Sequence, residues 1–185
     1  MQFNNKQAID VLAKLHAGGF PSAIVAGGCV RDEIFGKPVK DIDVFVSYED
    51  YENRTVNIQD VLGREVVLDG DSGDYEGGED AEVRGVVSLE PHEGELPVQV
   101  IVLAPGMSPL DRVGRFDFGF CQVAWDGNNL EFSLGFLKDF NNKTITLVHC
   151  ENQQEFDRSW VRLNRLMKKY LEFDYVIPEK YHGYV

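Results

Sequence analysis

The chain lacks the features that mark membrane and secreted proteins. No apolar run approaches the roughly 18 residues that a membrane-spanning helix needs. The opening residues, MQFNNKQAID, do not set a basic start before an apolar block, as secretory signals do. We therefore expect a cytoplasmic protein with no membrane partner.

The sequence also lacks closely spaced metal ligands. No CxxC pair occurs, and the cysteines and histidines are dispersed, which argues against the paired-ligand pattern of structural zinc sites. We expect the cysteines to be reduced and mostly buried. These dispersed residues are Cys29, Cys121, Cys150, His16, His92, His149 and His182.

Basic residues are scarce. Lys and Arg number 18 against 31 Asp and Glu, which gives a formal net charge of −13. Because phosphate backbones attract clustered Lys and Arg, this balance argues against extended DNA binding. It is compatible with a nucleotide carried with Mg²⁺, or with a short RNA end held by a local basic patch.

The 185 residues suit one domain, and hydrophobic periodicity predicts an α/β fold without internal repeats. The predicted helices span 8–16, 29–35, 135–140 and 155–173, with another within 50–62. The helix at 155–173 is expected to carry an apolar stripe formed by Phe156, Trp160, Leu163, Met167 and Leu171. The predicted strands span 22–27, 42–46, 65–68, 83–89, 97–103 and 144–148, and residues 118–124 and 130–133 are predicted to form a hairpin that turns at 126–129.

An acidic, glycine-rich stretch, DGDSGDYEGGED, occupies residues 69–80 and shows no periodicity, which predicts a mobile loop. A calcium loop is an alternative reading of its Asp spacing, but the order of an EF-hand with its terminal Glu is not reproduced. A further hypothesis is therefore a structural or interaction protein whose acidic loop at 69–80 binds a basic partner.

Residues 26–46, AGGCVRDEIFGKPVKDIDVFV, place two glycines, an Arg-Asp pair and an Asp-x-Asp pair in one strand-helix-strand unit. Two carboxylates on one strand face repel each other unless a cation joins them, so Asp41 and Asp43 form a natural Mg²⁺ site. Glycines let the backbone approach a triphosphate, the following helix offers amide groups, and Arg31 adds positive charge. The alternative is a solvated strand end beside an ordinary turn.

This stretch resembles the GGxVRDxLxGxxxxDxDxxV signature of the head domain of class II tRNA nucleotidyltransferases and poly(A) polymerases, within the polymerase-beta-like nucleotidyltransferase superfamily. The resemblance implies a two-metal Mg²⁺ site that acts on a nucleoside triphosphate. By this resemblance, Asp41 and Asp43 hold the catalytic metals, Gly27 and Gly28 contact the phosphates, and Arg31 and Asp32 position the nucleotide.

Fainter similarity continues downstream. LDRVGRFDFGFCQVAWDGN resembles the family's DLxxRDFTINALAxD segment, with Asp117 on its Asp and Cys121 in place of its Asn. VRLNRLMKKY resembles the neck helix, which implies that Arg162 and Arg165 contact phosphate. Basic residues on an amphipathic helix are also typical of a solvated face, so this alternative stays open.

Three departures from the family pattern affect specificity. Phe156 and Ser159 replace the Asp and Arg of the base-reading motif, so the preferred NTP stays open. Gln99 stands where several superfamily members have a third acid. The chain ends at Val185, soon after the neck helix, so we expect the helical body and tail that hold a tRNA to be missing.

We expect an α/β fold: a small mixed nucleotidyltransferase sheet flanked by helices, with a short C-terminal helical neck. Residues 1–150 would form the head domain and residues 151–185 the neck segment. The expected activity is Mg²⁺-dependent transfer of a nucleoside monophosphate from an NTP to an acceptor hydroxyl. The acceptor is an RNA 3′ end by resemblance, or a protein or small molecule. The alternative is a non-catalytic nucleotide-binding or regulatory module.

Overall fold

The computed structural model describes residues 1–67 and 82–184. These residues group into two compact units, which we describe separately. Unit 1 comprises Met1–Arg112 and Ala124–Glu131, and unit 2 comprises Val113–Val123 and Phe132–Val185. The loop predicted at 69–80 lies outside the described residues. The division into a head domain over 1–150 and a neck over 151–185 stays a prediction.

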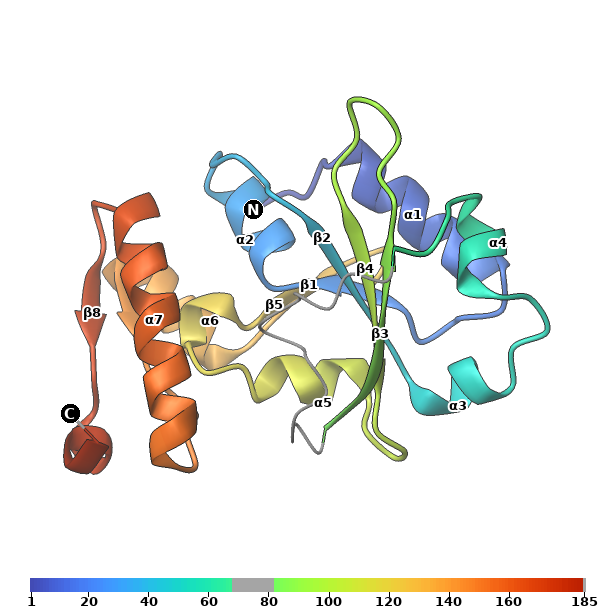
Figure 1. Cartoon of the computed structure of the whole chain (residues 1–185). Helices are drawn as coiled ribbons and strands as arrows, with labels where there is room; N and C mark the ends of the chain where they lie inside the picture. Colours follow the sequence, from blue (N-terminus) through green and yellow to red (C-terminus); the bar gives the residue numbers. More distant parts are fainter. Residues whose placement is uncertain (68–81, 185) are drawn as a thin grey trace. The chain divides into compact units, whose positions relative to one another are not determined.

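A six-stranded mixed sheet has the order β3-β4-β2-β1-β5-β6 (Figure 1). β2 and β4 pair in parallel, whereas β1 pairs antiparallel with β2 and β5, and β3 pairs antiparallel with β4. The sheet and its flanking helices confirm the predicted fold class. The strands are β1 (Ile24–Ala26), β2 (Ile42–Val46), β3 (Val83–Leu89), β4 (Val98–Leu103), β5 (Val123–Trp125) and β6 (Leu130–Phe132).

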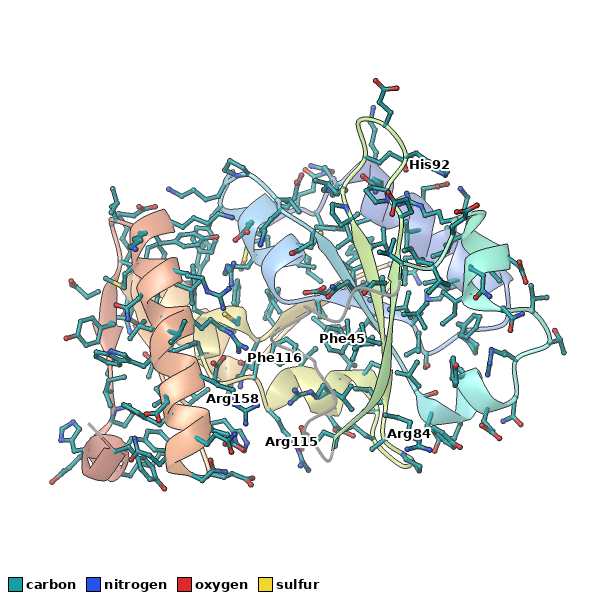
Figure 2. All side chains as sticks on the ribbon, viewed as in Figure 1. Phe45, Arg84, His92, Arg115, Phe116 and Arg158 are labelled. Atoms are coloured by element: carbon teal, nitrogen blue, oxygen red, sulfur yellow. The ribbon has the colours of Figure 1, made fainter. Side chains whose placement is uncertain are left out.

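The central strands β2 and β4 are rich in Val and Ile, and this composition favours their burial inside unit 1. On β2, Val44, Phe45 and Val46 are fully buried, and Phe45 is labelled in Figure 2. Asp41 and Asp43 interrupt this apolar run at the start of the strand, where both are half-buried. The core of unit 1 therefore ends at the position where the two acids begin.

The helices of unit 1 flank this sheet. In α1, Asn5 caps the first turn by accepting a hydrogen bond from the Ala8 amide at 3.0 Å, and the buried residues follow helical spacing. The predicted single helix within 50–62 is instead two short helices. The helices are α1 (Lys6–Ala17), α2 (Gly28–Ile34), α3 (Tyr48–Glu52) and α4 (Ile58–Leu62), and α5 (Pro109–Gly114) follows β4.

Unit 2 is held together by an aromatic core. Phe120 lies 4.8 Å from Tyr170 and 4.7 Å from Phe173 between ring centroids, and it stacks on Phe136. A two-stranded parallel sheet of β7 and β8 completes the unit, and β8 lies beside α7 (Figure 1). Its elements are η1 (Gly119–Cys121), α6 (Leu134–Asn142), β7 (Thr144–Thr146), α7 (Gln153–Lys169), β8 (Asp174–Val176) and η2 (Glu179–Tyr184).

Two local predictions for unit 2 were wrong. Residues 119–121, expected in a strand, form the 3-10 turn η1. The apolar stripe on α7 was expected to include Trp160 and Leu171, but their exposed fractions are 39% and 83%. Ser159 is buried in the stripe instead, because its hydroxyl has an acidic partner inside unit 2. Among the described residues, no helix combines the length and apolarity that crossing a bilayer requires.

Candidate functional site

The two glycines and the two acids meet at one end of the unit 1 sheet. β1 runs antiparallel to β2, so the turn after β1 lies at the end where β2 begins. Gly27 and Gly28 form that turn, Asp41 immediately precedes β2 and Asp43 lies within it. Gly27 has φ +67°, a left-handed conformation that favours glycine. The chain direction thus brings together residues that are 15 positions apart in sequence, Gly28 and Asp43.

Asp41 and Asp43 lie on the same face because side chains alternate along an extended chain. Asp41 has no hydrogen-bond or ion-pair partner among the residues that the structure describes. A half-buried carboxylate beside a second carboxylate is costly unless a cation or a donor compensates it. Asp41 is therefore placed to receive positive charge next to a second carboxylate.

Arg31 and Asp32 are both buried on α2 and bond to each other. The Arg31 Nε donates to Asp32 Oδ1 at 2.8 Å, and an Arg31 terminal nitrogen lies 2.7 Å from the same oxygen. That guanidinium also lies 3.6 Å from the position that a Cβ would occupy on Gly28. Arg31 therefore folds back over the glycine turn, with Asp32 fixing its orientation.

The thiol of Cys29 reports the electric field of this region. Burial raises the pKa of Cys29 most, and the negative charges of four surrounding carboxylates raise it further. These carboxylates belong, in decreasing order of effect, to Asp43, Glu33, Asp32 and Asp41. The prediction that Cys29 is buried is confirmed, since it is 1% exposed, and it forms no disulfide with a described residue. Several carboxylates therefore lie near this buried thiol.

Gln99 on β4 is the cross-strand neighbour of Asp43. The parallel register pairs Asp43 with Gln99, and the antiparallel register pairs Gln99 with Ser88 on β3. Paired residues present their side chains on the same face of a sheet. A neutral carboxamide therefore stands beside Asp43, at the position where a third acid would lie.

The donor set of this site fits Mg²⁺. Carboxylate oxygens are the ligands that Mg²⁺ prefers, and the ion commonly uses one or two carboxylates together with water and substrate phosphates. Within the described ranges, no group of three or more His, Cys, Asp or Glu side chains is placed to hold a metal ion. Asp41 and Asp43 are the two carboxylates at this end of the sheet that could serve as ligands, and their role as Mg²⁺ ligands stays a prediction.

Arg162 and Arg165 belong to unit 2, whereas the other predicted site residues belong to unit 1. Arg162 donates from Nη1 to Asp117 Oδ2 at 2.9 Å, and Ser159 Oγ donates to the same oxygen at 2.9 Å. Arg165 is exposed on α7. The phosphate-contact role of both arginines stays a prediction.

The two positions that replace the family's base-reading pair face inward in unit 2. Phe156 is buried and its ring stacks on Trp160 at 6.0 Å between centroids, and it lies 5.8 Å from Tyr184. Ser159 is 5% exposed and is bound by Asp117. These side chains serve the packing of α7.

The sequence alone did not predict that Asp117 organises unit 2. Besides the contacts of its side chain with α7, its carbonyl accepts hydrogen bonds from the amides of Val148 and His149 at 2.7 and 3.2 Å. Its partner Arg162 is 45 residues away in sequence, beyond the reach of any periodicity. A signal was nevertheless present, because Asp117 is one of the residues that carry the downstream similarity.

Unit 2 also contains a cleft of about 420 Å³. Its lining includes Gln122, Lys138 and His149. Gln122 is fully engaged, since its amide nitrogen donates to the carbonyls of Gly114 and Phe116 and its oxygen accepts from the Ser133 hydroxyl. None of the predicted site residues lines this cleft.

Comparison with solved structures shows which fold this is. The Bacillus stearothermophilus CCA-adding enzyme in complex with CTP superposes with a TM-score of 0.62 at 21% identity, covering 95% of this chain and 42% of that one. A CCA-adding enzyme with ATP gives a TM-score of 0.63 at 20% identity, covering 96% and 40%. The Thermotoga maritima enzyme complexed with tRNA gives 0.59 at 19%, covering 100% and 45%. The resemblance to class II tRNA nucleotidyltransferases is thereby confirmed at the level of the fold.

Sequence comparison gives a relative and a family. The CCA-adding enzyme of Streptococcus suis (strain 05ZYH33) is 35% identical over 80 residues, which cover 38% of this chain and 20% of that enzyme. The chain thus spans about a fifth of this curated relative and less than half of the solved structures above. A family model described as Gabija anti-defense 2 family protein matches residues 2–143. The chain therefore belongs to the Gabija anti-defense 2 (Gad2) family.

Proposed function

We propose that this protein is a Mg²⁺-dependent nucleotidyltransferase that moves a nucleoside monophosphate from an NTP to an acceptor hydroxyl and releases pyrophosphate. One observation carries the proposal: the glycine turn after β1 and the acids Asp41 and Asp43 lie at the same end of the sheet. Similarity to CCA-adding enzymes, whose solved structures contain CTP, ATP or tRNA, supports the same class of reaction.

The chemistry of each unit 1 residue suits a different role in the proposed transfer. The turn at Gly27 and Gly28 allows close approach of a triphosphate, and Arg31, steadied by Asp32, adds a positive charge beside that turn. Asp41 and Asp43 would hold Mg²⁺. The ion supplies charge neutralisation on the phosphates and lowers the pKa of an acceptor hydroxyl.

The transfer itself exchanges one bond to phosphorus for another. The acceptor oxygen bonds to the α-phosphorus while the bond to the oxygen bridging the α- and β-phosphorus breaks, pyrophosphate departs with that oxygen, and the hydroxyl proton passes to solvent water. Arg162 and Arg165 would contribute further phosphate contacts from α7. Arg162 would then share its guanidinium between phosphate and Asp117, which already fixes one of its nitrogens.

The family description suggests the biological role that this reaction would serve. Members are described as Gabija anti-defense proteins, and we propose that nucleotidyl transfer serves that role. The acceptor is then an RNA 3′ end, as the tRNA complex of a relative suggests, or a hydroxyl on a protein or small molecule. Phe156 and Ser159, which stand in place of the base-reading Asp and Arg, are both buried, so we expect weak discrimination between NTPs.

A non-catalytic nucleotide-binding module is the second candidate. The observation that favours it is Gln99, which places a neutral side chain beside Asp43. Asp41 weighs against it, because a half-buried carboxylate beside a second carboxylate is costly to keep unless a cation binds there.

Label transfer with matched variants separates the two candidates. The protein is incubated with each α-³²P-labelled NTP, Mg²⁺ and either total RNA or cell protein. The wild-type protein should label an acceptor, and Asp41→Asn with Asp43→Asn should not, while Asp10→Asn on the exposed face of α1 behaves as wild type. NTP binding without any transfer would support the binding module and contradict the enzyme.

A further inference from the structure

A row of polar side chains extends the acid site of unit 1 away from the glycine turn. The parallel pairing of β2 with β4 sets Gln99 beside Asp43, and the antiparallel pairing of β4 with β3 sets Ser88 beside Gln99. Adjacent strands lie about 4.8 Å apart, so this polar row reaches about 10 Å from the strand of Asp43 to that of Ser88. Directly paired residues share one face of a sheet, so the row presents a carboxylate, a carboxamide and a hydroxyl side by side.

Gln99 and Ser88 are half-buried, and neither side chain has a hydrogen-bond partner among the residues that the structure describes. Another half-buried glutamine of unit 1 is engaged, since Gln7 donates to the Leu96 carbonyl and accepts from the Leu96 amide, both at 2.8 Å. Half-covered polar side chains bond to protein, to water or to a ligand. Gln99 and Ser88 therefore keep their donors and acceptors available beside the acid pair.

The order of the strands fixes the side from which an acceptor approaches. β1, which ends at the glycine turn, lies on one side of β2, whereas β4 and β3 lie on the other. In phosphoryl transfer the attacking and leaving oxygens are roughly in line, on opposite sides of the phosphorus. With pyrophosphate at the glycine turn, the acceptor reaches the phosphorus from the β4 side, where Gln99 and Ser88 lie. This inference rests on the proposed function, which places the triphosphate at that turn.

The chemistry of the polar row suits a sugar. A carboxamide and a hydroxyl each donate and accept hydrogen bonds, which matches the hydroxyl groups of a sugar, and neither carries a charge. A peptide is less suited, because peptides that dock on a sheet bond to the backbone of an edge strand. At Ser88 that edge is already taken. The Val67 amide donates to the Ser88 carbonyl at 2.8 Å, and the Glu90 amide donates to the Glu65 carbonyl at 2.9 Å.

We propose that Gln99 and Ser88 bind the acceptor, and that the acceptor is a sugar with a second hydroxyl next to the one that reacts. The reacting hydroxyl lies at Asp41 and Asp43, the neighbouring hydroxyl bonds to Gln99, and Ser88 bonds to the same molecule further from the acids. The terminal ribose of an RNA and the ribose of a free nucleoside share this pair of hydroxyls. A protein side chain lacks it, because Ser, Thr and Tyr each carry one hydroxyl.

Binding of a ribose end tests the proposal without requiring transfer. The full-length protein, with Mg²⁺ and a saturating ATP analogue whose α–β bridge is a methylene group, is titrated into 5′-fluorescein-labelled tri-adenylate and followed by fluorescence anisotropy. Replacing the terminal 2′-hydroxyl by hydrogen should weaken binding to the wild-type protein about 2- to 12-fold, the range for one lost hydrogen bond. Gln99→Leu should weaken binding of the ribose probe equally and abolish the preference for ribose. Ser88→Ala should weaken binding of both probes by a similar factor.

Matched variants separate a role in binding from a role in folding. Ser88→Thr keeps the hydroxyl and should bind the ribose probe as the wild type does. Gln59→Leu alters another half-buried glutamine of unit 1, on α4, and should leave the ribose preference unchanged. All four variants should bind the ATP analogue with wild-type affinity in a filter assay. Ser88→Ala removes a single oxygen atom, so it decides the question even if Gln99→Leu fails to fold.

Competition distinguishes the two sources of the ribose. Displacement of the probe by adenosine, with weaker displacement by 2′-deoxyadenosine, would show that a free nucleoside is enough. Displacement by unlabelled tri-adenylate but not by adenosine would show that an RNA end is required. Either result supports a sugar acceptor.

Three results would overturn the proposal: no binding of either probe by the wild-type protein, equal binding of the ribose and deoxyribose probes, or transfer of an α-label to a serine peptide that Gln99→Leu leaves unchanged. Failure of the proposed function gives a different result. A ribose preference that depends on Gln99, without any transfer of label, would contradict the nucleotidyltransferase alone. Transfer to tri-adenylate that neither Gln99→Leu nor Ser88→Ala affects would contradict the role of the polar row alone.

Discussion

Replacing Asp117 by alanine should loosen α7 from the rest of unit 2. The Asp117 carboxylate accepts hydrogen bonds from Ser159 Oγ and Arg162 Nη1, both at 2.9 Å, and from the Phe118 amide at 3.0 Å. Alanine removes both acceptor oxygens, and with them all three hydrogen bonds, and leaves the donors in place. The cost depends on how well water can replace the carboxylate at each donor.

Burial sets the size of the effect. Ser159 is 5% exposed, so its hydroxyl would lose its partner without gaining water, which costs about 1–3 kcal/mol. The Arg162 side chain is 34% exposed, so solvent screens its ion pair and we assign it at most about 1 kcal/mol. The sum is roughly 1–4 kcal/mol, which corresponds to a fall in Tm of about 2–16 °C for a protein of this size.

Differential scanning calorimetry measures this change, with variants that isolate its cause. Asp117→Asn keeps one acceptor oxygen but loses the charge, so its Tm should fall between those of wild type and Asp117→Ala. Asp174→Ala removes an exposed carboxylate of β8 in the same unit and should stay within about 0.5 kcal/mol of wild type. Combined with Ser159→Ala, the alanine at 117 should cost less than the two single effects added, because both break the same bond.

Equal Tm values for Asp117→Ala and Asp174→Ala would refute this reasoning. The hydrogen bonds at Asp117 would then contribute nothing net to the stability of unit 2.

Three further predictions concern the site in unit 1. Gly27→Ala should lower Tm and weaken NTP binding in a filter assay, because φ +67° strains any residue with a Cβ by about 1–2 kcal/mol. The raised pKa of Cys29 keeps the folded thiol protonated while an unfolded thiol ionises near its ordinary value of 9.0. Its contribution to stability is therefore complete below pH 9 and is lost as pH rises above it, so Cys29→Ala should flatten the alkaline decline in urea unfolding midpoints. Gln99→Glu should tighten Mn²⁺ binding roughly tenfold by electron paramagnetic resonance, because affinity follows the charge of the oxygen ligands beside Asp43. An unchanged Tm for Gly27→Ala, an unchanged pH profile for Cys29→Ala, or an unchanged Mn²⁺ affinity for Gln99→Glu would each contradict the corresponding prediction.

Local sequence patterns predicted the parts of the fold that depend on local structure. The strand at 42–46 has the expected bounds. Its pattern, acids at the start followed by apolar residues, can be recognised from neighbouring positions in the sequence. The Gly27-Gly28 turn and the helix after it are also where they were predicted. Once these elements form, antiparallel pairing of β1 with β2 is enough to bring the glycines to the acids.

Features that depend on distant contacts were not predicted. The apolar stripe on α7 was misassigned because periodicity favours Trp160, whereas the bond to Asp117 allows the polar Ser159 to be buried. The turn at 119–121 adopts 3-10 geometry although its sequence is apolar, and Phe118 bridges to Leu147 instead. Hydrophobic pattern alone cannot encode a hydrogen bond between residues 42 positions apart.

A double-label experiment on ATP distinguishes nucleotidyl transfer from other reactions of the triphosphate. ATP labelled at the α-phosphate or at the γ-phosphate is incubated with the protein, Mg²⁺ and the acceptor pool, and the products are separated from free nucleotide. Nucleotidyl transfer predicts that the α-label appears on the acceptor and the γ-label in pyrophosphate, and that Asp41→Asn with Asp43→Asn loses both while keeping its thermal transition. Transfer of the γ-label to an acceptor, or unchanged transfer by the double variant, would contradict the account.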